Sequence, residues 1–340
     1  MDNPALTFAV ALAAGIAGQS IAWHLRIPGI VLLLGIGVLL GPDVATIVRP
    51  ETLGHGLDEI VGLAVAVVLF EGGLNLRWKR LRSEAKTIRR LITIGTVVTA
   101  AGGAVAANLL MGWDWRVALP FGAIIAVTGP TVITPLLRRI RIKRNVHTIL
   151  EAEAVLIDPI GAVLAVVLLE VVLDLTASSA AASLLGLPIR LGAGAVMGLV
   201  GGLLLGVALR FRRPVPEGYE NVFTLAMVLA LFEVSNALLP ESGIMTAAVA
   251  GLVVGNMRTR VQAELQEFKE QLTVLLVGLL FVLLAADVRV AEVVRLGWPG
   301  VLTVLSLMLV VRPLDVAVSA AGSDLTVRDR LFLSWIAPRG

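Results

Sequence analysis

Long apolar stretches recur along the whole chain, and they constrain its fold more than any other feature of the sequence. Each stretch is about 15–25 residues long, which is enough for an α-helix to cross the hydrocarbon core of a bilayer. Hydrophobic residues make up 57% of the 340 residues and charged residues only 16%, which is too apolar for an ordinary water-soluble domain. The sequence therefore predicts an all-α polytopic membrane protein.

The composition excludes several classes of site. Cysteine is absent, which excludes disulfide bonds, thiolate metal sites and cysteine nucleophiles. Only three histidines occur and none lies in an HExxH motif, which argues against a histidine-rich zinc site. The N-terminal apolar run lacks a preceding basic segment, so we expect a first span rather than a cleaved signal peptide. The net charge of +3 does not indicate nucleic-acid binding, because the positive charge is divided among the loops between spans.

We expect twelve membrane spans. The second and ninth are short and rich in glycine. The last stops within an apparent helix, LFLSWIAPRG, so we expect a C-terminally truncated chain that lacks the rest of this span and at least one more. The approximate limits are 5–24, 28–41, 57–76, 88–110, 117–137, 148–173, 184–210, 219–238, 242–257, 268–287, 297–320 and 329 onward.

The basic residues predict the orientation of these spans. Loops after odd-numbered spans contain 21 lysines and arginines, whereas loops after even-numbered spans contain 5. Basic residues concentrate in cytoplasmic loops, so the N-terminus is expected outside and the odd-numbered loops in the cytoplasm.

Two pairs of spans resemble each other at nearly the same offset. PGIVLLLGIGVLLG (28–41) matches SGIMTAAVAGLVVG (242–255) with a shift of 214 residues, and the Pro130 region matches the Pro338 region with a shift of 208. Apolar glycine-rich segments can resemble one another by chance, but two matches in corresponding spans make chance a weaker explanation. A shift of seven spans reverses orientation, which is typical of inverted-repeat transporters with a site near the membrane midplane.

The fifth span contains the features of a broken helix. Pro130 has no N–H to donate to the carbonyl of Ala126, and Gly129 leaves helical geometry at little cost. We expect an unwound stretch at Thr128–Pro130 that exposes backbone carbonyls and the Thr128 hydroxyl to protein or water. A simple packing kink is the alternative. Pro338 predicts a second break, where Arg339 would offset negative helix ends.

Asp158 is the main candidate for a functional side chain. It lies about 15 Å into the sixth span and Thr128 about 16 Å into the fifth, so both reach mid-membrane depth. An aspartate at this depth costs about 2.5–3.5 kcal/mol, which makes it a functional candidate by default. The alternative is a neutral, hydrogen-bonded structural side chain. Pro159 frees the carbonyl of Val155 and is a third expected position of helix breakage.

Other charged residues fall within the apolar spans. Glu153 lies about 140° around the helix from Asp158, so we expect it to pair with an arginine, either Arg312 or Arg339. Glu71 either reaches the transport cavity through water or extends to the interface. We expect structural, interfacial or solvent-exposed roles for the remaining acids, Glu151, Glu233, Asp287 and Asp315.

At TGPTVITPLLRRI, EAEAVLIDPIGAVLAV and WIAPRG the chain resembles the monovalent cation/proton antiporters, most closely the bacterial NhaP-type sodium (or potassium)/proton exchangers. The likeness covers nearly the whole chain, including LFEGGLNL and VRPL. It implies two inverted six-helix repeats with two discontinuous crossing helices, and a homodimer with interface and core domains. The expected divisions are 1–83 (interface helices), 84–176 (core), 177–290 (linker and interface) and 291–340 (incomplete core).

The resemblance also assigns roles to individual residues. Asp158 corresponds to the aspartate that binds either the alkali cation or the proton, and Thr128 to the threonine of the unwound helix. Glu153 corresponds to the glutamate that pairs with arginine, and Glu71 to an acid that faces the cavity. Gly129 replaces the usual aspartate of Thr-Asp-Pro. Ile157 replaces the usual asparagine before the aspartate, and Ala154 lacks a hydroxyl that some relatives carry. Selectivity between Na⁺ and K⁺ is therefore left open.

These features predict a secondary antiporter in the plasma membrane of a bacterium that exchanges Na⁺ or K⁺ for H⁺ with one-to-one stoichiometry. Thr128, Gly129, Glu71 and Asp158 are expected to bind the ion. No cofactor is expected beyond the transported ions, and a cytoplasmic regulatory domain could follow the last helix. The alternative is a symporter for organic anions or small solutes, which would need more basic and aromatic residues at the midplane. An intramembrane hydrolase is disfavoured, because no buried histidine accompanies a nucleophile.

Overall fold

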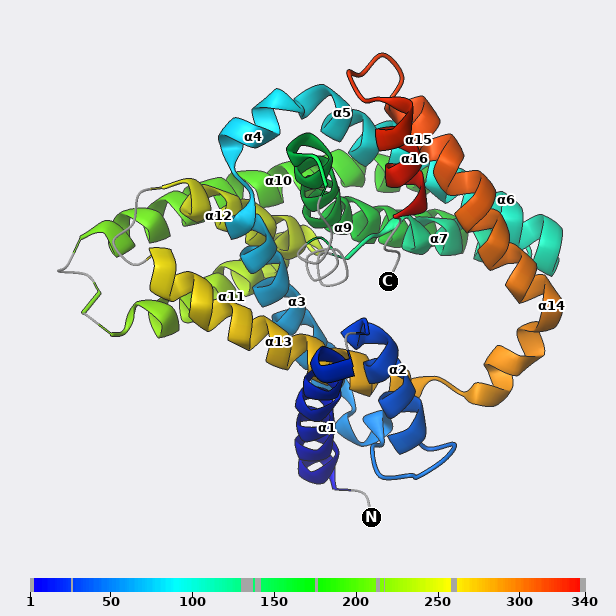
Figure 1. Cartoon of the computed structure of the whole chain (residues 1–340), viewed down its shortest axis with the longest axis horizontal. Coiled ribbons are helices and arrows are strands. Elements are labelled where there is room, and N and C mark those ends of the chain that lie inside the picture. The colour runs from blue at the N-terminus through cyan, green and yellow to red at the C-terminus, as the bar shows by residue number, and fades with distance from the viewer. Residues whose placement is uncertain are drawn as a thin grey trace.

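The computed structural model describes residues 3–25, 27–129, 137, 142–174, 177–211, 215–216, 218–257 and 262–336, with side chains omitted for 177–179 and 262–269. Within these ranges the regular structure is entirely helical. Figure 1 shows α9 near the middle of the molecule, where it packs against α7, α10 and α12. The helices α1, α2 and α13 pack on one another at the end that carries the N-terminus.

The described residues of the first half of the chain form six longer helices and several short elements. They are α1 (Pro4–Leu25), α2 (Gly29–Leu40), the 3₁₀ helix η1 (Pro50–Leu53), α3 (His55–Asn75), α4 (Trp78–Ser83), α5 (Ala85–Arg90), the π-helical turn η2 (Leu91–Gly95), α6 (Thr96–Met111), α7 (Trp115–Ala126) and α9 (Arg144–Leu173). 

The second half repeats this alternation of long helices with short elements. It contains α10 (Ala177–Arg210), α11 (Glu220–Leu238), α12 (Ser242–Asn256), α13 (Gln262–Asp287), α14 (Val290–Ser306), the π-helical turn η3 (Leu307–Val311), α15 (Arg312–Ser319) and α16 (Val327–Trp335).

Each of the twelve predicted spans contains helix in the structure. Among the described residues, seven helical segments are long and apolar enough to cross a membrane, and α2, α7 and α12 are shorter apolar helices. The predicted shortness of spans two and nine is confirmed, because α2 has 12 residues and α12 has 15. The predicted starts of spans six and seven are too late. The helix α9 begins at Arg144, because it extends into polar sequence, and α10 begins at Ala177, because it extends into a segment of alanine and serine.

The two π-helical turns support the internal repeat at a third pair of spans. Leu91 and Leu307 begin π-helical turns within spans four and eleven, 216 residues apart. This offset is close to the shift that relates α2 to α12 in the sequence. The turns also pack reciprocally, because η2 contacts α15 while η3 contacts α6. The repeat is therefore visible in local backbone geometry as well as in glycine positions.

Glycines allow several helices to approach one another very closely. At Gly251 and Gly255 of α12, an added Cβ would collide with the carbonyl oxygens of Phe70 and Leu74 on α3. Gly15 of α1 and Gly278 of α13 lie backbone to backbone in the same way. Small residues stabilise helix pairs in membranes because close backbone approach maximises van der Waals contact.

This packing predicts that Gly251→Val destabilises the protein by about 1–3 kcal/mol, because the added side chain would force α12 away from α3. Gly35→Val on α2 is a matched control, since no described atom lies within 4 Å of the position of its Cβ. Thermal unfolding in detergent should show a clearly lower midpoint for Gly251→Val alone. Equal midpoints for the two variants would contradict the proposed tight α3–α12 contact.

Candidate functional site

The polypeptide leaves helical geometry at the end of α7, as predicted. Asp114 caps the start of this helix and accepts a hydrogen bond of 2.8 Å from the backbone N–H of Arg116. The helix ends at Ala126, and Val127 is extended with φ −67° and ψ 137°. Gly129 precedes Pro130, and a residue before proline is displaced from helical geometry by the proline ring. Pro130 itself lies outside the described residues.

Thr128 lies in this non-helical stretch and is buried, with 2% of its surface exposed. Its Oγ1 has no hydrogen-bond partner among the described residues. A buried polar group without a partner is costly, so such a group in a folded protein requires an explanation. A transient ligand that the hydroxyl oxygen contacts is one such explanation.

Asp158 lies on α9 and has the same property. Its Oδ1 is buried and has no hydrogen-bond partner in the described part of the chain. The expectation that Pro159 breaks this helix is wrong, because α9 runs without interruption from Arg144 to Leu173. Pro159 removes one backbone hydrogen bond, but many intact turns on either side keep the helix continuous.

A close contact between the end of α7 and α9 brings the segment that carries Thr128 against the helix that carries Asp158. Gly161 lies three residues after Asp158, and therefore on nearly the same face of α9. A Cβ at Gly161 would collide with Cγ2 of Val127 and lie 3.6 Å from its Cα. Val127 directly precedes Thr128. The absence of a side chain at Gly161 thus allows the unwound end of α7 to reach the face of α9 that carries Asp158.

This arrangement offers oxygen ligands around a single carboxylate. Unwound backbone and half-helix ends coordinate alkali cations and protons in membrane transporters. Among the described residues, no group of three or more His, Cys, Asp or Glu side chains could hold a metal ion. The described part of this arrangement therefore consists of one carboxylate, one hydroxyl and a short stretch of non-helical backbone.

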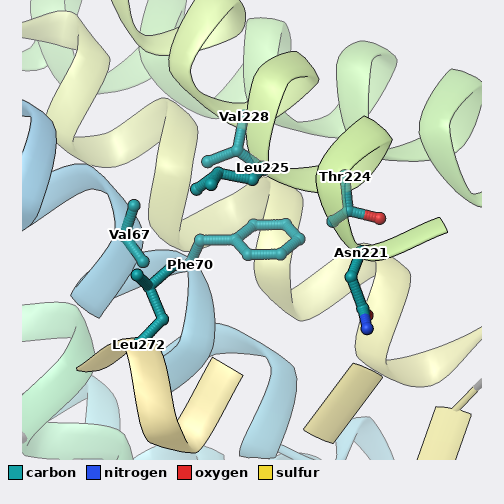
Figure 2. A pocket seen from close by; sticks show the side chains of 7 residues that line it. All are labelled: Val67, Phe70, Asn221, Thr224, Leu225, Val228 and Leu272. Atoms are coloured by element: carbon teal, nitrogen blue, oxygen red, sulfur yellow. The ribbon is translucent and has the colours of Figure 1, made fainter. Parts of the chain in front are cut away.

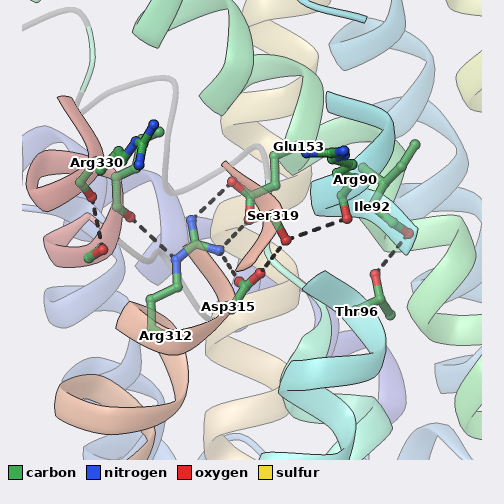
Figure 3. Close-up of polar contacts among 10 residues, drawn as sticks. Arg90, Ile92, Thr96, Glu153, Arg312, Asp315, Ser319 and Arg330 are labelled. Carbon is green, nitrogen blue, oxygen red and sulfur yellow. Dashed lines mark hydrogen bonds and ion pairs between the residues drawn. The ribbon is translucent and has the colours of Figure 1, made fainter. Parts of the chain in front are cut away.

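A buried ion-pair network lies one and a half turns before Asp158 on α9 (Figure 3). Arg312 of α15 donates to both oxygens of Glu153, at 2.5 and 3.0 Å, and to Oδ2 of Asp315 at 2.8 Å. Its Nε donates to the carbonyl of Leu333 on α16 at 3.3 Å. Ser319 donates to Oδ1 of Asp315 at 3.2 Å. Arg312, Glu153 and Asp315 are exposed by 1–2% only.

The network fixes α9 against the C-terminal helices. Glu153 comes from α9, Arg312 and Asp315 from α15, and the Leu333 carbonyl from α16. A second link lies at the start of α9, where Lys143 donates to Asp329 of α16 at 2.9 Å. Removing one partner of a buried ion pair leaves a charge without compensation, so the contacts of Arg312 determine the position of α9 strongly. The Lys143 side chain is exposed, so its ion pair contributes less.

Several sequence expectations have other outcomes. Asp315 has the structural role expected for it, but its partner was not predicted: it is the second acid on Arg312, and the i,i+3 spacing of the two residues could have indicated this contact. Glu151 is not at a helix start, because α9 begins seven residues earlier, and it lies 3.2 Å from the ring of His147. Glu71 is partly buried on α3. Pro338 and Arg339 lie outside the described residues.

A small slot between α3, α11 and α13 is separate from this site. Figure 2 shows the ring of Phe70 between the aliphatic side chains and Asn221. The slot has a volume of about 10 Å³, which suffices for one water molecule and no larger ligand. Its lining residues are Val67, Phe70, Asn221, Thr224, Leu225, Val228 and Leu272.

The buried network predicts that Arg312→Met destabilises the protein by about 3–5 kcal/mol, because two carboxylates would lose their cation. The triple variant Glu153→Gln, Arg312→Met, Asp315→Asn should recover part of this loss, since no buried charge is then uncompensated. Arg328→Met is the control, because Arg328 is exposed on α16. Thermal unfolding in detergent measures all three, and similar midpoints for Arg312→Met and Arg328→Met would refute the assigned role.

Comparison with known proteins places the chain among membrane ion exchangers. The family described as "Sodium/hydrogen exchanger, transmembrane" matches residues 8–340. The Na(+)/H(+) antiporter 1 of Methanocaldococcus jannaschii is 29% identical, and the match covers 97% of this chain and 79% of that protein. The K(+)/H(+) antiporter NhaP2 of Shewanella sp. (strain MR-4) is 27% identical, with 98% of this chain and 58% of that protein covered.

The fold has a similar solved counterpart. The structure of the sodium proton antiporter MjNhaP1 from Methanocaldococcus jannaschii at pH 8 matches with a TM-score of 0.85 and 27% sequence identity. The match covers 98% of this chain and 84% of that chain. The helices described above therefore follow the same path as those of that protein.

Proposed function

Because the chain belongs to the sodium/hydrogen exchanger family, we propose that it exchanges a monovalent alkali cation for a proton across a membrane. One observation carries the proposal: Asp158 Oδ1 and Thr128 Oγ1 are both buried without a described partner, on elements that meet at Gly161 and Val127. The chain spans little more than half the length of the K(+)/H(+) antiporter that it matches. That the chain has the exchange activity of such a longer protein is therefore part of the proposal.

The exchange follows from competition at one carboxylate. Asp158 holds either a proton or an alkali cation, and Thr128 with the unwound backbone supplies further oxygen ligands for the cation. Either form is neutral and can cross the barrier when the core helices move. The ionised, empty aspartate would carry a bare charge through a medium of low dielectric constant, which is prohibitive. The two fluxes are thereby coupled one to one, and the exchange is electroneutral.

The remaining residues support this centre. Glu153 and Arg312 hold α9 in position, and Glu71 faces the cavity from α3. Residues 84–176 and 291–340 form the moving core, and residues 1–83 and 177–290 form the linker and the interface of a homodimer. The protein lies in the plasma membrane of a bacterium with its N-terminus outside, needs no cofactor, and can be followed by a cytoplasmic regulatory domain in a longer chain.

The relatives do not favour a symporter, since those described above bear antiporter names for Na⁺ and for K⁺. A transport assay determines which of these cations the protein exchanges. Na⁺, K⁺ and Li⁺ are added separately to everted vesicles that contain a pH-sensitive dye. The proton gradient should be dissipated only by a cation that the protein transports. A protein that responds to none of the three is not an alkali cation antiporter.

Asp158→Asn should abolish exchange, because an amide can neither release a proton nor neutralise a cation. The measurement is cation-dependent proton flux in proteoliposomes, with folding checked by thermal unfolding. Asp287→Asn is the matched control, since Asp287 is exposed at the end of α13 and should retain full activity. Normal flux through Asp158→Asn would overturn the proposed role of Asp158.

Gly161→Val should reduce exchange by about tenfold or more, because a misplacement of about 1 Å at a binding centre can cost a factor of a hundred. The added side chain would separate Val127 from α9 and move Thr128 away from Asp158. Gly192→Val on α10 is the control, since no described atom lies within 4 Å of the position of its Cβ. Equal flux through both variants would show that the α7–α9 contact does not form the site.

A further inference from the structure

A basic recess lies between α4 and the first turns of α9. Its volume is about 450 Å³, within the range of ligand-binding pockets. We call it the α4–α9 recess. It is lined by Lys79, Arg80, Ser83, Glu84, Arg144, Asn145 and Thr148.

The charges in this recess are unbalanced. Lys79, Arg80 and Arg144 face one carboxylate, Glu84. In the part of the chain that the structure describes, none of these three cations forms an ion pair. Other basic residues do so, as with Arg190, which lies 2.8 Å from Glu170, and Arg289, which lies 2.7 Å from Glu51. The recess therefore gathers positive charge that the described protein does not neutralise.

One polar side chain beside the cations retains a donor for an anion. The hydroxyls of Ser83 and Thr148 already donate to the carbonyls of Arg80 and Arg144, at 2.7 and 3.0 Å, so they offer an anion no hydrogen. Asn145 accepts from the N–H of Val146 at 2.9 Å, which leaves its amide nitrogen as a donor. Two guanidinium groups and one ammonium are the groups that proteins use for phosphate oxygens. A transported alkali cation would be repelled here, so the recess is not part of the centre at Asp158.

We propose that the α4–α9 recess binds a phosphate oxyanion, carried either by the headgroup of an anionic phospholipid or by a soluble phosphate. Basic pockets between membrane helices bind anionic headgroups in this way. Arg80 and Arg144 supply the guanidinium groups, Lys79 a third positive charge, and Asn145 an amide donor. Glu84 opposes binding and limits its affinity.

Binding would strengthen the link between two parts of the fold. The α4 segment is attached to the end of α12, because Arg77 donates to the Gly255 carbonyl and Asn256 accepts from the backbone of Trp78, both at 2.8 Å. Arg144 belongs to α9. Because α9 already packs against α4 and α12, an anion held by Arg80 and Arg144 together would add a further link between them and raise the thermal stability of the protein. This effect does not depend on the proposed ion exchange.

The test measures binding to the full chain in detergent. Native mass spectrometry counts bound phosphatidylglycerol, with phosphatidylcholine as the zwitterionic comparison, and thermal unfolding is followed with added inorganic phosphate. Arg80→Gln and Arg144→Gln should each weaken binding by about fivefold, since one basic residue near a surface contributes about that factor. Glu84→Gln should strengthen it. Arg82→Gln is the matched control, because Arg82 is exposed on α4 and does not line the recess.

The outcomes distinguish the source of the phosphate. Binding of phosphatidylglycerol alone supports a lipid headgroup, and stabilisation by inorganic phosphate alone supports a soluble ligand. If the variants unfold at the same temperature as the wild type without added anion, their weaker binding does not result from misfolding. The proposal is overturned if neither probe binds, if Arg82→Gln loses as much affinity as Arg80→Gln, or if Glu84→Gln leaves affinity unchanged.

Discussion

The hydrogen-bonded ion pair between Arg312 and Glu153 is the interaction on which the rest of the site depends. It places a guanidinium with 1% exposure between Glu153 of α9 and Asp315 of α15, with the Leu333 carbonyl of α16 as a further acceptor. Burial makes each charge costly without the others, so the network tolerates little displacement. Because Asp158 lies five residues after Glu153 on one uninterrupted helix, the network also determines where that carboxylate lies.

The polar groups of the network have hydrogen-bond partners, whereas two oxygens of the centre have none in the described part of the chain. Arg312 donates to four protein oxygens, whereas Thr128 Oγ1 and Asp158 Oδ1 have no partner among the described residues. A satisfied network is rigid, whereas buried oxygens without a partner require an explanation, and the proposed exchange supplies one. The contact of Gly161 with Val127 joins the two regions, because it sets the distance between the unwound end of α7 and the helix that the network holds.

Local sequence predicted much of the fold. Apolar length located helices correctly, since each predicted span contains helix, and seven described helical segments are long and apolar enough to cross a membrane. Gly129 and Pro130 located the end of α7, since both act on the backbone directly. The same local reasoning failed at Pro159, where helix on both sides outweighed one lost hydrogen bond. It also missed Asp315 as a partner of Arg312, although the two lie three residues apart on one helix.

The sequence by itself determined that the chain crosses a membrane many times, that one helix unwinds near Thr128, and that an aspartate lies deep in an apolar span. These properties depend on hydrophobic length and backbone chemistry, which act over a few residues. The tertiary structure alone decided which arginine meets Glu153, across 159 residues of sequence, and that α4 and α9 enclose a basic recess. Such contacts depend on how helices pack, and packing is settled by the shapes of distant side chains and by the absence of side chains at positions such as Gly161.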